Sequence, residues 1–108
     1  MNKYSDKSDF EINKAVAEEL IQSGFIVGVE YHDKHILVMD KYANNYPFAP
    51  CNNPADAMPI IIENKIDLTH LVGDMVCAKH KEYWCIRKNP YRAGCEVYLL
   101  MKDAENEK

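Results

Sequence analysis

Two cysteines and two histidines lie in one stretch of the chain, where their side chains could bind zinc. Cys77, His80 and Cys85 fall within nine residues, and His70 precedes them. Zinc takes thiolate and imidazole ligands, but its usual signatures are close pairs that converge from turns. Side chains alternate along a strand, so Cys77 and His80 point to opposite faces, and in a two-residue hairpin Cys85 shares a face with His80 only. We therefore expect core cysteines here and no metal site.

Cys51 is the thiol that a helix could activate. It stands just before Asn-Pro-Ala-Asp, which is typical of a helix start, and a helix N-terminus can lower a thiol pKa. A cysteine nucleophile also needs a base and an oxyanion site. His70 and His80 are the candidate bases, but nothing in the spacing requires either to approach Cys51, and Asp56 would oppose a thiolate. We therefore predict no catalytic residue and no cofactor and lean against an enzyme; a small cysteine-, histidine- or zinc-dependent enzyme is the alternative.

Recognition is the chemistry that the middle of the chain favours. Residues 41–53 (KYANNYPFAPCNN) are rich in tyrosine and asparagine, which are typical of adaptable binding loops. Trp84 lies in an expected strand, as either a core anchor or a stacking platform. Arg92 lies in the first turn of an expected helix, where the helix dipole prefers acids. It could pair with Asp56 or hold an anionic partner. The predicted binding residues are Tyr42, Tyr46, Asn52, Asn53, Asp56, Trp84 and Arg92.

The first element that must position these residues is a helix. Ser8 and Glu11 form a capping box, in which each side chain can bond the other residue's backbone N–H. Apolar residues follow at three- and four-residue spacing from Ile12 onward, as on one face of a helix. Gly24 is a natural stop. The sequence predicts a helix over residues 9–22.

Residues 25–40 predict a hairpin. A turn centred on Asp33-Lys34 places Tyr31 opposite Ile36 and gives the hairpin one apolar face. Asp-Lys is a poor type I′ turn, so a longer loop with a shifted register is the alternative. Residues 41–53, which follow, are expected to form a long irregular loop.

A second hairpin is predicted over residues 74–88, around Lys81-Glu82.

Histidines flank the turn of the first hairpin, because His32 and His35 stand on either side of Asp33-Lys34. Two imidazoles there could form a weak metal or pH-sensitive site. Two solvated turn residues are the expected outcome.

An Asn-Pro pair marks the next helix start. Asn53 suits the N-cap and Pro54 the first helical position. Pro59 removes one helix hydrogen bond, so we expect a helix over 54–64 that bends near its start, with a strand from Ile60 as the alternative. Residues 65–68 are a candidate short strand.

Asn89-Pro90 repeats the same helix-start pattern. The helix is expected to run to about Lys102, with its apolar residues inward: Ala93, Val97, Leu100 and Met101. The tail beyond it is acidic and expected to fray.

These elements give the order α-β-β-α-(β)-β-β-α. That order predicts an α+β fold with a small, mainly antiparallel sheet of two hairpins packed with about three helices. A chain of 108 residues suits a single domain over residues 1–108, with frayed ends at 1–7 and 103–108. The core of so small a domain is modest, so we expect a homo-oligomer.

Composition narrows the classes of partner and location. A net charge of −4 opposes a nucleic-acid binder, because phosphate contacts need clustered lysine and arginine. No apolar run approaches the roughly 18 residues of a membrane span. The polar N-terminus is unlike a secretory signal. We expect a cytoplasmic location in a host cell, where the four cysteines stay reduced.

Three blocks of the chain carry a family resemblance. They are DFEINKAVAEEL (9–20), CNNPADAMPIIIENKIDL (51–68) and NPYRAGCEVYLLM (89–101). In these blocks the sequence resembles the NinX family of small proteins of lambda-like phages and prophages. The middle block is the most specific, and residues 69–88 match less well. Family members often have tryptophan at the position of Met58, a departure that concerns packing.

The resemblance implies a phage origin more than an activity, because the family is of unknown function and offers no catalytic residues. By association it implies a non-enzymatic accessory protein for host takeover or counter-defence. The expected partner is a host protein, whose surface would be occupied, or a small anionic, nucleotide-like ligand. A nucleic-acid accessory protein is the remaining alternative.

Overall fold

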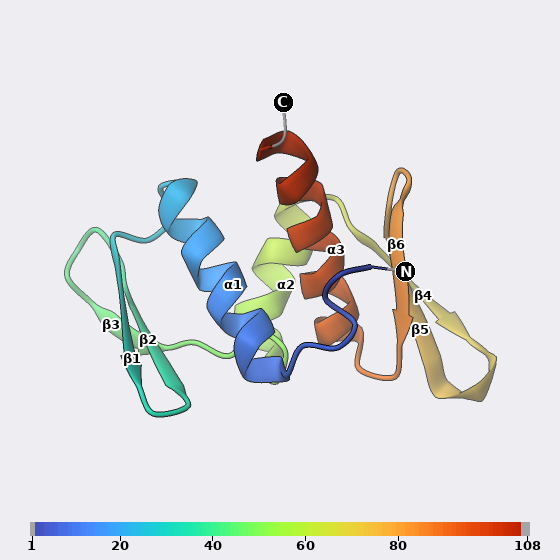
Figure 1. The fold of residues 1–108 in the computed structure, drawn as a ribbon, viewed down its shortest axis with the longest axis horizontal. Helices are drawn as coiled ribbons and strands as arrows, with labels where there is room; N and C mark the ends of the chain where they lie inside the picture. The colour runs from blue at the N-terminus through green and yellow to red at the C-terminus, as the bar shows by residue number, and fades with distance from the viewer. Residues whose placement is uncertain (1, 107–108) are drawn as a thin grey trace.

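Helices form the centre of the molecule and two small sheets flank them (Figure 1). The computed structural model describes residues 2–106. The helices are α1 (Asp9–Gln22), α2 (Pro54–Glu63) and α3 (Pro90–Asn106). One antiparallel sheet holds β1 (Gly28–His32), β2 (His35–Met39) and β3 (Asn45–Pro47); the other holds β4 (Asp67–Leu71), β5 (Met75–His80) and β6 (Tyr83–Arg87). A short 3-10 turn, Val72–Asp74, joins β4 to β5. The fold is α+β, as predicted, with two three-stranded sheets in place of one small sheet.

The capping box at the start of α1 forms as predicted. The Ser8 hydroxyl accepts a hydrogen bond from the Glu11 backbone N–H at 3.1 Å, and the Glu11 carboxylate accepts one from the Ser8 N–H at 3.0 Å. The bond from the Ser8 backbone is the main cause that lowers the pKa of Glu11. The apolar face of α1 is buried from Ile12 to Leu20, so this helix is fixed by both its cap and its period.

Both hairpins have the predicted two-residue turns. Tyr31 pairs with Ile36 in the first hairpin, and His80 pairs with Tyr83 in the second. The poor Asp-Lys turn does not shift the register, because Asp33 adopts a φ of 59°, which aspartate tolerates better than most residues. Lys81 adopts a similar φ of 56° in the second turn.

The prediction that residues 41–53 form an irregular loop is wrong in its centre, where β3 adds a third strand to the first hairpin. The Asp40 carboxylate causes this. It accepts hydrogen bonds from the backbone N–H groups of Tyr42 at 2.8 Å and Asn44 at 3.0 Å, which turns the chain back along β2. Pro47 is tolerated because β3 is an edge strand.

Helix α2 contains Pro59 within a continuous helix, so the alternative strand from Ile60 is wrong. Asn53 caps the helix start by accepting a hydrogen bond from the Ala55 N–H at 3.0 Å. Ile60 and Ile61 are buried from the helix, so the isoleucines serve its apolar face. The following strand β4 lies at 67–71, where 65–68 was predicted.

Helix α3 is the central element and contacts both other helices as well as β5 and β6 (Figure 1). Every residue from Arg92 to Leu99 is buried, whereas the sequence predicted one inward face that included Leu100 and Met101. Those two residues are half-buried. The difference arises because neighbours pack around the whole first half of α3, which no helical period encodes.

The chain ends that were expected to fray are described in part, as turns near the N-terminus and as the end of α3. Helix α3 continues through Asn106, four residues beyond the predicted end, and the tail beyond Asn106 lies outside the described residues. Residues 2–7 form turns that the Tyr4 hydroxyl joins to Asp103 by a short hydrogen bond. Burial first, and then this bond, raise the pKa of Tyr4.

An ionic cluster around Glu96 connects α3 to the rest of the fold. The Glu96 side chain is fully buried and accepts hydrogen bonds from Arg87 at 2.8 and 2.9 Å and from Arg92 at 2.7 Å. Arg92 also donates to the Asp9 carboxylate at 2.8 Å and to the backbone oxygens of Tyr4 and Lys7. Burial disfavours its charge, but the bonds to Glu96 and Asp9 raise the pKa of Arg92. The cluster therefore joins β6, α3, α1 and the N-terminal turns.

Replacing Glu96 with glutamine should strongly destabilise the fold. The change keeps the volume but leaves two guanidinium groups without their shared carboxylate, and losing one partner of a buried ion pair costs about 3–5 kcal/mol. Chemical denaturation should show this loss in the free energy of unfolding. Glu105→Gln is the control: its pair with Lys102 lies on the surface, so less than about 1 kcal/mol is expected. Equal effects of both changes would refute the role of the cluster.

Helices α2 and α3 cross so closely that only glycine fits at position 94. A Cβ atom there would lie 2.5 Å from Cδ1 and 2.7 Å from Cγ1 of Ile61, whose side chain is buried. Gly94 therefore serves the packing of the two helices.

Gly94→Ala should destabilise the protein although alanine favours helices. Overpacking costs about 1–3 kcal/mol, and the better helix propensity returns at most about 1 kcal/mol. In an Ile61→Ala background the clash disappears, so the same glycine change should become neutral or stabilising. A double-mutant cycle by chemical denaturation measures this coupling. Simple additivity of the two changes would contradict the proposed contact.

Candidate binding site

The site is a groove between the C-terminal half of α1, β3, α2 and the second half of α3, which we call the Tyr46 groove. It has a volume of about 560 Å³. Its apolar lining consists of Leu20, Phe25, Ile26, Tyr46, Phe48, Ala55, Pro59, Ile60 and Tyr98. Its charged residues are Asp40, Asp56, Glu63 and Lys102. The groove is therefore an apolar surface with an acidic rim.

Tyr46 and Asp40 are held together at one end of the groove. The Tyr46 hydroxyl donates a 2.5 Å hydrogen bond to the Asp40 carboxylate, which also accepts from Asn44. The bond from Tyr46 is the main cause that lowers the pKa of Asp40 to about 2, and the same bond raises the pKa of Tyr46. Asp40 therefore stays ionised at neutral pH and presents a fixed negative charge beside an aromatic ring.

Asp56 anchors the loop between β3 and α2. Its carboxylate accepts a hydrogen bond from the Ala49 N–H at 3.0 Å. It does not pair with Arg92, which was one expectation for both residues. Glu63 is exposed on the rim, and Lys102 forms a 3.2 Å ion pair with Glu105. Because Glu105 balances the one base of the rim, the groove is negative.

The groove brings together only two of the predicted binding residues, Tyr46 and Asp56. Tyr42 lies on the exposed turn before β3 and is 74% exposed. Asn52 donates to Asp9 at 3.2 Å, so its amide joins the loop to α1. Asn53 caps α2.

Trp84 and Arg92 lie away from the groove. Trp84 is on β6 and is 56% exposed, so it is a surface residue of the second sheet and not a core anchor. The hydrogen bonds of Arg92 all run to groups of the chain itself.

Sequence reasoning missed most of the groove lining. Phe25 is 63% exposed beside Ile26, directly after α1, and was assigned to a strand. Pro59 was considered only for its effect on the backbone, yet its ring lies on the groove surface. No local sequence signal marks these residues as groove lining, because the groove forms only when α1, α2 and α3 pack together.

The structure shows where the cysteines lie and how burial affects two of them. Residues 2–106 contain no group of three or more metal-ligating side chains placed to hold an ion. Contact with the Cys51 thiol and then burial raise the pKa of Cys95. Burial likewise raises the pKa of Cys85 to about 12. These buried thiols lack the lowered pKa of a nucleophile.

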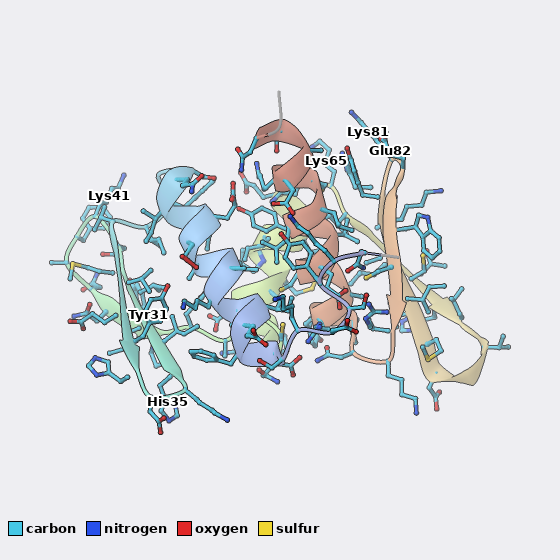
Figure 2. All side chains as sticks on the ribbon, in the orientation of Figure 1. Tyr31, His35, Lys41, Lys65, Lys81 and Glu82 are labelled. Atoms are coloured by element: carbon cyan, nitrogen blue, oxygen red, sulfur yellow. The ribbon has the colours of Figure 1, made fainter. Side chains whose placement is uncertain are left out.

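The histidines have local roles. His80 lies with its Nδ1 3.1 Å from the Lys65 carbonyl oxygen, and the strand register puts it on the face opposite to Cys77, as predicted. His32 and His35 pair across the first turn, where Figure 2 shows His35 at the tip of the hairpin, and both are exposed.

Comparison with known families identifies the relatives of this chain. Residues 3–102 match the family described as bacteriophage P22 NinX. The chain belongs to the NinX family. The match spans nearly the whole chain, so it also covers the second hairpin, which contributed little to the resemblance seen in the sequence. No curated protein and no solved structure matches the chain. None of the helices in residues 2–106 is long and apolar enough to span a membrane.

Membership in the NinX family identifies a phage accessory protein and assigns no activity. The Tyr46 groove is therefore identified by its geometry alone.

Tyr46→Phe should raise the pKa of Asp40 from about 2 toward its ordinary value of 3.8, because the hydroxyl that stabilises the carboxylate is lost. A carboxylate with a lowered pKa stabilises the fold above its unfolded-state pKa, and this contribution disappears as the pH falls through the folded-state pKa. In the variant this contribution should therefore be smaller, and its loss should be complete at a higher pH. A carboxyl ¹³C NMR titration measures the pKa directly. Tyr42→Phe, which removes a hydroxyl that does not bond Asp40, should leave the pKa of Asp40 unchanged. Equal pKa shifts in both variants would contradict the role of the Tyr46 hydroxyl.

Proposed function

We propose that this NinX family protein is a non-enzymatic accessory protein that binds a host protein in the host cytoplasm. Binding would serve host takeover or counter-defence by occupying a surface of that protein. The observation that supports the proposal is the Tyr46 groove, which combines an open apolar lining with a negative rim.

The chemistry of the groove defines the kind of partner segment. The apolar lining suits one or two large aliphatic or aromatic side chains, which provide most of the binding energy in protein interfaces. The carboxylates of Asp40, Asp56 and Glu63 around it suit lysine or arginine on either side of that anchor. The partner is therefore a segment of a host protein that carries an apolar anchor flanked by basic residues.

The groove offers less to an anionic ligand. A nucleotide would bring its phosphates to three carboxylates, while Lys102 is already paired with Glu105. Arg92, which was expected to hold such a ligand, is bound to Glu96 and Asp9 inside the fold. We therefore choose the protein partner over the small anion and over nucleic acid.

Two substitutions test the groove. Phe25→Ser removes an exposed apolar contact, and Glu63→Lys reverses an exposed rim charge; each should weaken binding at least about tenfold, as hot-spot and charge-reversal changes do. Val72→Ser, in the turn between β4 and β5, and Asp67→Lys, on β4, are matched controls outside the groove, where Val72 is 95% exposed and Asp67 is exposed. Thermal unfolding followed by circular dichroism should show that all four variants fold.

The binding measurement has two stages. Host proteins captured by the wild type are identified by mass spectrometry, together with co-purifying small molecules. Calorimetry then measures the purified partner against each variant, at low and high salt, and the affinity should fall with added salt. A partner that binds both groove variants with wild-type affinity would refute the proposed site. Displacement of the partner by a co-purifying anion would favour the small-ligand alternative.

A further inference from the structure

Among the described residues, the outer edge of β6 bonds to no other strand of its sheet, and the N-terminal turns lie beside it. A second cavity of about 560 Å³ follows this edge. Consecutive residues from Glu82 to Arg87 line it, and residues of the N-terminal turns and Leu100 complete the lining. Consecutive residues point alternately to the two faces of a sheet, so a cavity lined by all of them lies along the backbone edge.

The hairpin geometry determines which backbone groups this edge presents. His80 and Tyr83 close a two-residue turn, and such a closing pair exchanges two hydrogen bonds. Hydrogen-bonded pairs alternate along an antiparallel ladder, so Tyr83, Cys85 and Arg87 bond to β5. Trp84 and Ile86 therefore direct their N–H and C=O groups to the open edge. The strand carries no proline to block pairing, and natural proteins rarely leave such an edge unprotected.

We propose that two copies of the chain pair through β6 in antiparallel fashion, about a two-fold axis at Cys85, and join their sheets into one of six strands. This register makes Trp84 face the partner's Ile86 as a hydrogen-bonded pair, so that each strand's free backbone groups meet those of the other. An aromatic residue opposite a β-branched one is a favourable cross-strand pair. The proposal is independent of the Tyr46 groove, which lies elsewhere on the molecule.

Charge complementarity identifies a second copy as the occupant. In the same register Glu82 lies opposite the partner's Lys88, and the two-fold axis repeats this pair at the other end of the strand. Figure 2 shows Glu82 at the tip of the β5–β6 hairpin. Both residues are exposed, and neither forms an ion pair among the described residues of its own chain. An interface of this kind is self-complementary, as an isologous contact requires.

The same pairing explains an exposed apolar surface. Trp84 and Ile86 lie on the outer face of the sheet, and Cys77 on β5 is the cross-strand partner of Ile86. An antiparallel sheet with one solvated face normally carries polar residues there. Pairing across the axis brings both copies of Trp84 and Ile86 into one patch, where each tryptophan is covered by the opposite strand.

Charge reversal tests the register. Sedimentation equilibrium over a concentration series should show a dimer for the wild type. Glu82→Lys alone, or Lys88→Glu alone, creates two like-charge pairs and should weaken the dimer at least about tenfold. Mixing the two single variants should restore a heterodimer, because each Lys then faces a Glu at both ends of the strand. The double variant E82K/K88E should again form a homodimer. Lys34→Glu, on the tip of the other hairpin, is the control and should leave dimerisation unchanged.

The single tryptophan provides a second measurement. Its fluorescence should shift to shorter wavelength as the dimer forms, with the same concentration dependence as sedimentation. A wild-type protein that stays monomeric at millimolar concentration would overturn the proposal. So would a dimer that the two charge reversals do not weaken, or an edge that binds only an extended segment of another protein. Retained binding of the host partner by monomeric variants would separate this failure from that of the groove.

Discussion

The fold depends on the burial of one carboxylate, Glu96, between two guanidinium groups. A buried carboxylate alone would be prohibitively costly, so its position is tenable only because Arg87 and Arg92 both donate to it. Arg92 in turn needs a second acid, and Asp9 at the start of α1 supplies it. Two acids and two bases thus balance one another from three different elements. The ion pairs reinforce the apolar packing of α1 and β6 against α3, because moving either element away would leave a charge without its partner.

This internal balance shapes what remains for binding. Arg92 is withdrawn from the surface, and Lys102 is paired with Glu105, so the groove next to α2 keeps a negative rim. The central helices also separate the two sheets, so Tyr46 of the groove and the edge of β6 belong to different sheets (Figure 1). A protein built in this way can pair with a second copy through one sheet and hold a partner beside the other. A dimer would then carry two grooves, and a partner held in one groove would meet the other at a raised effective concentration.

Sequence reasoning succeeded where a structure is determined by neighbouring residues. The cap of α1, the turns at Asp33-Lys34 and Lys81-Glu82 and the Asn53 cap of α2 each involve residues within a few positions of one another. It failed at Arg92, where the deciding partner is distant in the chain, and at β3, where the deciding contact is local but its residues also suit a loop. Arg92 meets Asp9 across 83 positions, and no local pattern separates this role from anion binding. The third strand β3 was missed because it depends on the turn that the Asp40 carboxylate stabilises, whereas the composition of residues 41–53 favours a loop.

Asparagines and tyrosines mark both binding loops and capped turns, so their presence does not tell the two apart. What distinguishes them is whether their polar atoms already have partners. Asn52 and Asn53 have theirs, and Asn89 donates to the Cys51 carbonyl at 2.6 Å while capping α3. No buried side-chain nitrogen or oxygen among residues 2–106 lacks a partner. The groups left to recognise another molecule are therefore on the surface: the carboxylate of Glu63 beside an apolar groove, and the backbone edge of β6 between Glu82 and Lys88. Since an unpaired strand edge invites pairing whatever the sequence, the charges at its two ends are what make that pairing selective.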